Sequence, residues 1–498
     1  MAGGHKMPHA FPASRSIKPN PCLFTAIDVT AQTGLQDIAI IGMSCVFPGA
    51  PDVTTYWENI LGKVDAVTDP PDDWEGLDHY DPTSTANDRI YCKSGGWLKD
   101  VSFTPAEFGV MPVGIDGADP DHFLGLTLAH RALQDAGYAD RAFDRTRAEI
   151  IVGRGTYINR AFTNQLQHCL VIDQTVALLQ QLHPEHTPEE LQAIKRTLKA
   201  GLAPFSADTA PGLVPNVMTG RIANRLDFMG PNYTVDAACA SSLVALELAL
   251  QDLRSGKCDL SLVGGANVAT AAPTFMLFCQ LNALSRRGEI RPFDRDADGT
   301  ILGEGYGMVV LKRAEDAFRD GDNIYALVKS VGVASDGRAQ SVLSPRIEGE
   351  ALAIRRAYEA AGVAVDSVGL VEAHGTGTIV GDAVEVQALT RVFGSRCGRS
   401  PSCALGTVKS MIGHLIPAAG IAGVIKAALA LHHKVLPPTL RCENPHPRLE
   451  LHKTPFYING DARPWIHGAQ TPRRAAVNAF GFGGINAHAL LEECPWQS

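Results

Sequence analysis

Short apolar runs, most of them closed by glycine or a polar turn, recur along the chain from residue 37 onward. The clearest of these runs, each predicting a short buried strand, are Asp37–Gly42, Glu149–Gly153, Leu260–Gly265 and Val368–Glu372. Between such runs lie stretches with apolar residues at helical spacing, such as Asp121–Gly137 and Gly349–Gly362. This alternation predicts an α/β protein whose sheets are covered by helices.

One further helix is predicted outside the main alternation. The run Thr187-Pro188-Glu189-Glu190 forms a capping box with proline at the first helical position. Leu191, Ile194 and Leu198 then share one face, and Gly201 is placed to end the helix. We expect a surface helix that covers the core; the alternative is a lid or partner-docking helix.

Two parts of the chain repeat one order of elements. In the first, a strand-like run passes through Cys239 into an apolar helix that closes near Gly256. In the second, the strand-like run Thr407–Lys409 passes through His414 into another apolar helix. Each part ends in a glycine-rich turn that leads into a strand-like run, Gly303–Gly307 and Gly481–Gly484 respectively. The repeated order predicts a duplicated α/β unit.

Composition narrows the class of protein. Of 498 residues, 45% are hydrophobic and 19% charged, which is enough apolar material for a sizeable core and excludes global disorder. The net charge of −9 and a pI near 6.0 give no basic footprint, so nucleic acid is not expected as a partner. The odd count of 11 cysteines is typical of free thiols in a reducing compartment.

Targeting signals do not stand out. Residues 1–36 lack the apolar segment of a signal peptide and are expected to be a leader or linker, partly disordered. No uncharged apolar run reaches the roughly 18 residues that a membrane span needs. We therefore expect a cytoplasmic protein without a membrane partner.

Cys239 is a candidate nucleophile. It stands between a predicted strand and a predicted helix, where unpaired N–H groups and the helix dipole stabilise a thiolate and lower its pKa. Small neighbours on both sides allow a tight strand-to-helix turn and the close approach of a substrate. The alternative is a cysteine that packs as a small buried hydrophobe.

Two histidines are candidates of the same kind. His374 follows a predicted strand beside flexible glycines, and His414 follows Lys409, which offers a charged neighbour. Either could instead be a turn or capping histidine satisfied by backbone. Because active sites of α/β folds lie at the ends of strands, we expect Cys239, His374 and His414 to meet, with backbone N–H groups of Gly481–Gly484 as an oxyanion hole.

The spacing of residues in the sequence gives little support for a metal site or a nucleotide cofactor. The chain has no H-E-x-x-H or C-x-x-C motif, so no metal site is predicted. The glycines of Gly375–Gly381 miss the dinucleotide-binding spacing by one residue, and no acidic partner follows at the expected distance. No tightly bound cofactor is expected.

Taken together, these segments resemble the β-ketoacyl synthases, the ketosynthase domains of polyketide and fatty-acid synthases. The matching segments are Asp37–Gly42 with Phe47–Gly49, Val235–Leu243, Phe293-Asp294 with Gly303–Gly305, His374–Thr378 with Gly381-Asp382, Val408–Ser410 with Ile412–His414, and Gly481–Gly484 with Asn486–His488. The resemblance spans about residues 37–493 and is nearest to the ketosynthases of type I polyketide and polyunsaturated-fatty-acid-like synthases.

The resemblance implies a fold and a division of the chain. The fold would be the thiolase fold, an α/β architecture in which two pseudo-repeated halves form five αβαβα layers. The N-terminal half, with the nucleophilic cysteine, would span residues 37–335, and the C-terminal half, with both catalytic histidines, residues 336–495. Members of the family are usually homodimers.

The resemblance also implies a reaction. Cys239 would receive an acyl chain from an acyl carrier protein, and His374 and His414 would stabilise the enolate formed when a malonyl-type extender loses CO₂. Attack of this enolate on the acyl group would give a 3-oxoacyl product. Acyl groups would arrive as phosphopantetheine thioesters, and a megasynthase would add an acyltransferase and other domains as partners.

Further residues receive supporting roles by resemblance. Phe482, flanked by Gly481 and Gly483, would supply an oxyanion-hole N–H and a ring that gates the acyl tunnel. Lys409 and Glu304 would support the catalytic groups. Met411 stands where relatives commonly carry asparagine, and we expect it to alter the pocket.

Three alternatives stay open at the level of sequence. The first is a Cys–His acyl hydrolase, the second a CoA-dependent thiolase, and the third an inactive chain-length or scaffold homologue. Two histidines plus Lys409 fit decarboxylative condensation better than hydrolysis. Retention of Cys239 argues against the inactive homologue, because such homologues characteristically lack the cysteine.

Overall fold

A computed structural model describes residues 36–99, 101–115, 118–155, 160–207, 209–396, 400–468 and 471–495. The predicted leader over residues 1–36 lies outside these residues except for Gln36, so it stays a prediction. All the described residues belong to one compact unit.

Eleven strands of the described residues form one hydrogen-bonded sheet, in the order β10-β8-β7-β12-β13-β6-β1-β5-β4-β2-β3. The strands of the N-terminal half are β1 (Ile38–Val46), β2 (Ala148–Arg154), β3 (Asn232–Val235), β4 (Leu260–Asn267) and β5 (Gly305–Arg313). Those of the C-terminal half are β6 (Ala326–Ser335), β7 (Leu370–Glu372), β8 (Cys403–Gly406), β10 (Phe456–Ile458), β12 (Arg474–Gly481) and β13 (Ile485–Glu492). A separate small pair joins β9 (Val435–Leu436) and β11 (Arg463–Pro464).

The two halves repeat one strand order. Strands β1-β5-β4-β2-β3 correspond in sequence of pairing to β6-β13-β12-β7-β8, and antiparallel pairing of β1 with β6 joins the halves. In each half a central antiparallel pair, β4–β5 or β12–β13, is followed outward by parallel strands. This arrangement agrees with the predicted duplication. It also connects the two sets of strands, because Ile38 pairs with Val328 and Ile40 with Ala326.

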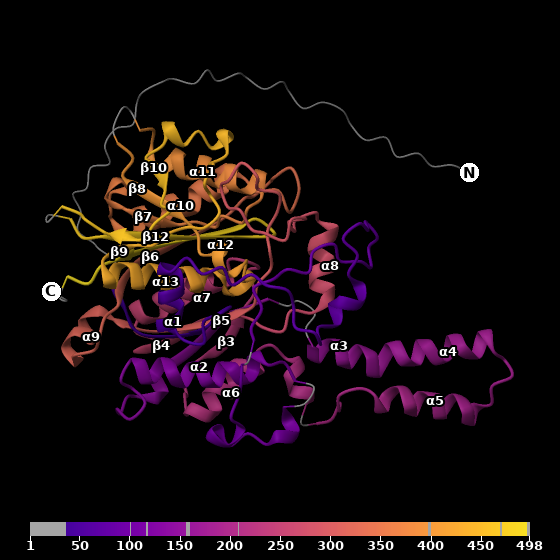
Figure 1. Cartoon of the computed structure of the whole chain (residues 1–498). Helices are drawn as coiled ribbons and strands as arrows, with labels where there is room; N and C mark the ends of the chain where they lie inside the picture. The colour runs from indigo at the N-terminus through magenta and orange to yellow at the C-terminus, as the bar shows by residue number, and fades with distance from the viewer. Residues whose placement is uncertain are drawn as a thin grey trace, which may run out of the picture. The chain divides into compact units, whose positions relative to one another are not determined.

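Helices complete five layers, which Figure 1 shows edge-on. Helices α7 (Ser241–Arg254) and α13 (Ala419–His433) lie between the strands of the two halves and share one buried apolar cluster with both. Outside the N-terminal strands lie α2 (Asp121–Asp135) and α6 (Val217–Leu226), and outside the C-terminal strands α10 (Ile347–Ala361) and α11 (Ile379–Phe393). The layers are those of the predicted αβαβα fold.

The central helix α13 is almost entirely apolar and buried, apart from Lys426 within it and the two histidines at its end. Together with the turn before it, α13 forms the stretch Ile416–His433, which is long and apolar enough to cross a bilayer, but 89% of that window is buried inside the protein. A helix that is hydrophobic all round is expected at the centre of a large fold. This burial explains the most hydrophobic run in the sequence.

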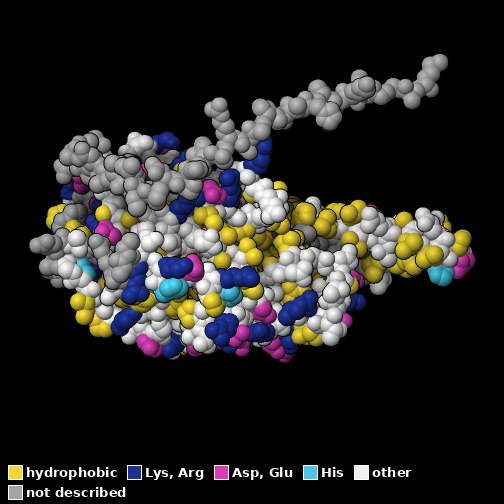
Figure 2. All heavy atoms as spheres, turned by 90° about the horizontal axis from the view of Figure 1, so that it is seen from above, with side chains coloured by type: hydrophobic (Ala, Val, Ile, Leu, Met, Phe, Trp, Pro, Cys, Tyr) yellow, Lys and Arg dark blue, Asp and Glu magenta, His cyan; other side chains and the backbone are white. Residues whose placement is uncertain are grey.

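The segment between β2 and α6 forms a helical hairpin. It comprises α3 (Arg160–Leu166), a π-helical turn (Gln167–Val171), α4 (Ile172–Leu182) and α5 (Pro188–Ala200). The predicted capping box at Thr187 is present. The expectation that this helix covers the core is wrong: α5 packs on α4, away from the layers (Figure 1), and Leu198 is exposed. Figure 2 shows apolar side chains along the same projection.

Four further α-helices lie within the described residues: α1 (Val53–Leu61), α8 (Ala272–Gln280), α9 (Ala314–Asp320) and α12 (Lys409–Ile412). The prediction that Thr407–Lys409 is part of a strand is wrong, because β8 already ends at Gly406 and Lys409 begins α12. The Val408 N–H donates to Oε1 of Glu372 at 2.7 Å, which turns the chain away from the sheet.

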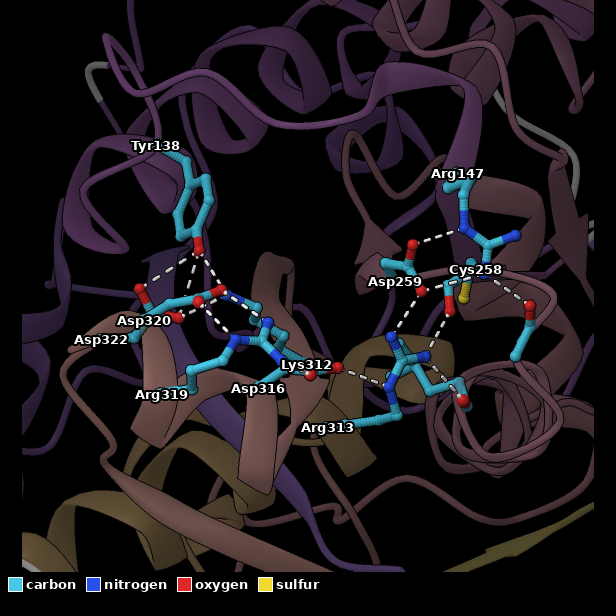
Figure 3. A network of polar contacts seen from close by, with 12 residues as sticks. Tyr138, Arg147, Cys258, Asp259, Lys312, Arg313, Asp316, Arg319, Asp320 and Asp322 are labelled. Carbon is cyan, nitrogen blue, oxygen red and sulfur yellow. Dashed lines mark hydrogen bonds and ion pairs between the residues drawn. The ribbon is translucent and has the colours of Figure 1, made fainter.

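A network of ion pairs and hydrogen bonds joins α9 to the ends of nearby strands of the N-terminal half (Figure 3). Arg147 and Arg313, which precede or end strands of the sheet, both pair with Asp259. Hydrogen bonding from Arg147 lowers the pKa of Asp259 to about 2. Nearby, the Lys312 ammonium donates to the Tyr138 hydroxyl at 2.6 Å. The network anchors α9 and the loops around it to the strand ends.

Candidate active site

Cys239 lies in a tight turn between β3 and α7. Ala238 has φ +48°, in the left-handed region, and α7 begins at Ser241. The Ser241 hydroxyl accepts from the Ala237 N–H at 2.9 Å and donates to the Ala238 carbonyl at 2.6 Å, which locks the turn. A Cβ on Gly481 would come within 2.6 Å of the Ala237 carbonyl, so that loop approaches the turn closely.

His414 is positioned by backbone pairing. Its N–H donates to the Ile301 carbonyl at 2.7 Å, and its own carbonyl accepts from the Gly303 N–H at 2.9 Å. Gly413 before it has φ +76°, and a Cβ there would meet the Leu302 carbonyl oxygen at 2.9 Å. This geometry brings Nε2 of His414 to 3.1 Å from Sγ of Cys239.

His374 reaches the same point from the end of β7. The Glu385 carboxylate on α11 accepts from the backbone N–H groups of His374 and Gly375 at 2.7 and 2.8 Å. The His374 and His414 rings meet edge to face, with centroids 5.3 Å apart and an interplanar angle of 87°. The three side chains expected to meet therefore do meet.

One cavity of about 450 Å³ opens onto these groups, and Cys239, His374, His414, Gly481 and Phe482 all line it. The Phe482 ring stacks on Phe278 with centroids 5.6 Å apart. Gly483 is not among the lining residues, although its φ of +88° belongs to the turn that presents Phe482.

The resting thiol is not a low-pKa thiolate. Burial raises the pKa of Cys239 to about 12, although Lys409 and the backbone N–H groups of Phe482 and Cys239 act in the opposite direction. The predicted lowering by the helix start is thus wrong, since desolvation of the charged form outweighs it. Burial first, and then Lys409, also hold the pKa values of His374 and His414 well below the ordinary range. Both imidazoles are neutral at pH 7.

Lys409 lies beside the site without lining the cavity. It is buried, its Nζ donates to the Ala373 carbonyl at 3.4 Å, and burial lowers its pKa. The neighbouring Glu372 pairs with Lys426 at 2.6 Å, and both of these side chains are almost fully buried. Lys409 thus places positive potential next to the cysteine and both histidines.

Glu304 does not reach the cavity. Its carboxylate accepts from the Leu98 N–H at 3.1 Å and the Thr270 N–H at 2.7 Å, and burial raises its pKa to about 7. Its effect on the site passes through the backbone, because the adjacent Gly303 pairs with His414. Met411 is also absent from the cavity lining and is buried in the central core, so the expectation that it alters the pocket is wrong.

Two positioning carboxylates escaped the sequence analysis. Glu385 holds the His374 backbone, and Asp382 accepts from the Phe293 N–H at 2.7 Å and the Gly377 N–H at 3.2 Å. Both lie on α11, so their helical spacing of three residues after the glycine-rich loop was the available signal. Most of their partners are backbone N–H groups, and the Asn478 side-chain amide also donates to Glu385 at 2.7 Å, so the pairing depends on segments that are distant in the sequence.

Among the described residues, one group has side chains close enough together to hold a metal ion. It is the buried cluster of Asp119, Asp121 and His122. Arg154 pairs with both carboxylates, at 3.0 and 2.5 Å, so a guanidinium already occupies the place beside them that a metal ion would take. None of these residues lines the cavity around Cys239.

Comparison with known proteins agrees with this geometry. The model of the β-ketoacyl synthase N-terminal domain matches residues 35–317, and that of the C-terminal domain residues 325–443. The chain is 37% identical over 464 residues to one subunit of the polyunsaturated fatty acid synthase of Thraustochytrium, covering 92% of this chain and 16% of that protein. It is 34% identical over 463 residues to the polyketide synthase PksL of Bacillus subtilis, covering 92% and 9%.

Solved structures agree. The ketosynthase from module 6 of the bacillaene synthase of Bacillus subtilis superposes with a TM-score of 0.77 at 33% identity, covering 92% of this chain and 72% of that one. The oxazolomycin ketosynthase domain OzmH KS7 of Streptomyces albus gives 0.78 at 34% identity, covering 93% and 75%. The chain spans less than a fifth of the two synthases compared above. It belongs to the β-ketoacyl synthase family and has the thiolase-like α/β fold of ketosynthase domains.

Proposed function

We propose that the chain catalyses decarboxylative Claisen condensation between an acyl group on Cys239 and a malonyl-type extender on an acyl carrier protein. The product would be a 3-oxoacyl thioester of the carrier, as in polyketide or fatty-acid biosynthesis. The observation that carries the proposal is the 3.1 Å approach of His414 Nε2 to Cys239 Sγ, with His374 edge-on in the same cavity.

The first step loads the acyl group. Because the thiol pKa is about 12, Sγ attacks the thioester carbonyl only as its proton leaves, and Nε2 of His414 is within reach to take that proton. A sulfur–carbon bond forms at Cys239, and the bond to the carrier's pantetheine sulfur breaks. The departing thiolate then recovers the proton from His414, which restores the neutral imidazole.

The second step makes the carbon nucleophile. Loss of CO₂ from the malonyl group leaves its electron pair on the thioester as an enolate, whose charge rests on the carbonyl oxygen. Neutral His374 and His414 can each donate a ring N–H to that oxygen once Cys239 is acylated and carries no proton. Donors fixed in a buried site stabilise developing charge without reorganising.

The third step joins the chains. The enolate carbon attacks the acyl carbonyl on Cys239, and the backbone N–H groups of Cys239 and Phe482 would hold the resulting oxyanion. Collapse of this intermediate breaks the carbon–sulfur bond and releases the Cys239 thiolate, which takes up one proton from water, the proton that the net reaction consumes. Positive potential from Lys409 favours each anionic stage.

The test supplies acyl- and malonyl-carrier protein and follows intact mass and CO₂ together. We expect an acyl adduct on Cys239, release of one CO₂ per condensation, and a 3-oxoacyl carrier product. Free carboxylic acid in place of that product would identify a hydrolase. Carbon–carbon bond formation or cleavage with CoA thioesters and no CO₂ would identify a thiolase, and no adduct would identify an inactive homologue.

Assembly follows the same proposal. Strand β3 is at the edge of the sheet with half-buried residues and a free side opposite β2, which supports a homodimer joined through this edge. We place the division between the part that carries Cys239 and the part that carries both histidines at 335/336; β6 ends there and precedes this division, although it pairs with β13 of the C-terminal strands. No disulfide joins any two of the nine cysteines within the described ranges, which supports a cytoplasmic location. Acyltransferase and other synthase domains are proposed as further partners.

A further inference from the structure

The hairpin of β12 and β13 presents Phe482 at its turn and carries a buried polar pair in its middle. Asn478 on β12 lies directly opposite His488 on β13, so both side chains point to the same face of the hairpin. Asn478 is 1% exposed and His488 is 0% exposed. Neither is among the residues that line the cavity around Cys239, and no step of the proposed reaction uses them. Their burial therefore needs another explanation.

The pair is linked by hydrogen bonds to the backbone of His374. Nδ1 of His488 lies 2.5 Å from Oδ1 of Asn478, and Nδ2 of Asn478 donates to Oε1 of Glu385 at 2.7 Å. The Glu385 carboxylate also accepts from the N–H groups of His374 and Gly375, at 2.7 and 2.8 Å. The loop that carries His374 is thus tied, through Glu385, to the β12–β13 hairpin.

The direction of these hydrogen bonds follows from the chemistry of the carboxylate. A carboxylate only accepts, so the amide nitrogen of Asn478 faces Glu385 and its amide oxygen faces His488. Nδ1 of His488 therefore carries a proton and donates it to that oxygen. Burial lowers the pKa of His488 to about 3, so the imidazole is neutral at pH 7 and has one N–H to donate. His488 thereby holds the Asn478 amide in the orientation that Glu385 needs.

Glu385 depends on these donors because it is buried. Burial raises the pKa of its carboxyl, while hydrogen bonds from Gly375, Asn478 and His374 act in the opposite direction. A buried carboxylate that loses the Asn478 donor moves or takes up a proton. In both cases it holds the two backbone N–H groups less firmly.

The ring of His374 contacts the same face of the hairpin. Phe480 lies two residues after Asn478 on β12, so it is on the same side of the strand. Its ring centroid is 5.6 Å from that of His374. A catalytic donor must be held within about 0.5 Å of its productive position. The hairpin therefore contacts His374 both at its ring and, through Glu385, at its backbone.

We propose that Asn478 and His488 are positioning residues for His374. They act through Glu385 and touch no substrate. The inference rests on the proposed function, in which His374 serves decarboxylation but not the loading of Cys239. Loss of the pair should therefore slow decarboxylation and leave loading nearly unchanged. A pair that served only the folding of the hairpin would impair both steps alike.

The test measures the two steps one after the other in the same protein. Loading is followed by intact mass with hexanoyl-N-acetylcysteamine, and decarboxylation is then followed in the loaded protein by release of labelled CO₂ from malonyl-carrier protein. For His488→Leu we expect decarboxylation to slow about tenfold and loading to stay within about twofold of the parent rate. His488→Asn places an amide N–H where Nδ1–H stood and should recover most of the loss.

A double-variant cycle tests whether the two residues act as one chain. Asn478→Leu should slow decarboxylation at least as much as His488→Leu, and the protein with both changes should be no slower than Asn478→Leu alone. His122→Leu is the matched control, since His122 is also 0% exposed but lies on α2 and does not line the cavity. Its two rates should keep the parent ratio. If the leucine variants do not fold, His488→Ala removes the donor without adding bulk and tests the same point.

A measurement without turnover separates this proposal from the proposed reaction. Hydrogen exchange of the peptide that contains the His374 and Gly375 amides, followed by mass spectrometry, should be faster in His488→Leu than in the parent and near the parent rate in His488→Asn. Faster exchange, in a protein whose parent releases no CO₂, would support the positioning role and remove the proposed reaction. Unchanged exchange with an unchanged ratio of the two rates in both leucine variants would overturn the positioning role. Equal slowing of both steps, or additive losses in the double variant, would overturn it as well.

Discussion

The two halves of the fold share a strand order but differ at the positions that carry the chemistry. After β3 the chain passes straight through Cys239 into α7, whereas after β8 it forms α12 and the Gly413 turn before His414 and reaches α13 after Ile416, whose φ is +50°. The equivalent helices thus begin near one another at the centre, one after the Cys239 thiol and the other after the His414 imidazole. The repeated order of elements places two strand-to-helix connections opposite each other, and the different lengths of these connections give each one a different functional side chain.

The outer edges differ as well. Strand β8 is covered by β10, which pairs with it in parallel through Phe456–Ile458. Strand β3 has no such neighbour in the described residues, and its side chains are only half-buried. An uncovered edge strand is available for pairing with another chain. The comparison therefore supports chemistry in both halves and supports the proposed self-association through the N-terminal half.

Removing the nucleophile of the N-terminal half should have the largest effect. Cys239→Ala should lower condensation by about 10⁴-fold or more, since among the described residues no other thiol lines the cavity. Cys239→Gln should keep malonyl decarboxylation, because both imidazoles remain in place. Chain elongation by the Cys239→Ala protein, measured by mass spectrometry of the carrier product, would remove the cysteine from its assigned role.

Removing the donors of the C-terminal half should come next. His374→Ala and His414→Ala should each slow decarboxylation by about 10²- to 10³-fold, because each removes one fixed donor to the enolate oxygen. Release of labelled CO₂ from malonyl-carrier protein measures this step without condensation. Full-rate decarboxylation in the double variant would contradict the assignment of both histidines.

Among changes that affect stability rather than catalysis, breaking the buried ion pair between Lys426 and Glu372 should have the largest effect. Lys426→Met leaves Glu372 buried without its ammonium partner, so it should lower the free energy of unfolding by about 3–5 kcal/mol. Urea denaturation measures the loss. The double variant Lys426→Met, Glu372→Gln should recover part of it, and equal losses in the single and double variants would show that packing and not the unpaired charge is responsible.

The state of the thiol gives a pH prediction. Since burial raises the pKa of Cys239 to about 12, its thiolate fraction should still rise about tenfold per pH unit from pH 7 to 9. Alkylation by iodoacetamide, followed by intact mass in a Cys169→Ser background, should increase about 100-fold over that interval. A rate that levels off near pH 7 would instead restore the thiolate expected from the helix start.

The turn before His414 should be less tolerant than an open turn. Gly413→Ala combines a left-handed φ with a close contact to the Leu302 carbonyl, so it should lower stability by about 1–3 kcal/mol and displace His414. Gly362→Ala, at φ +62° with no atom within 4 Å of the added Cβ, is the matched control and should cost about 1 kcal/mol without loss of activity. Equal effects of both changes on decarboxylation would remove the proposed link between the turn and the histidine.

Much of the fold and site was predictable because it depends on local pattern. The runs at β1, β2 and β4 and the periodicity of α2 and α10 identified elements within a few residues of their ends. Cys239 and His374 were found because each follows a strand, and strand ends of α/β units converge. His414 was found on the same expectation, although the short helix α12 separates it from the end of β8. The strand boundary at Gly406 was missed, since a distant carboxylate, Glu372, turns the chain there.

Other features depend on contacts between distant segments. Leu281, Val342 and Val380 carry no shared motif, and they line one cavity because α8, the β6–α10 segment and α11 meet there. The pKa of the Cys239 thiol also depends on distant segments, because the residues that bury Sγ come from both halves. Hydrophobic periodicity and the residues at strand ends are local properties of the chain, so the sequence alone predicts them. Desolvation, exposure and the facing of two half-sites arise from packing, and they became visible once the halves were assembled in three dimensions.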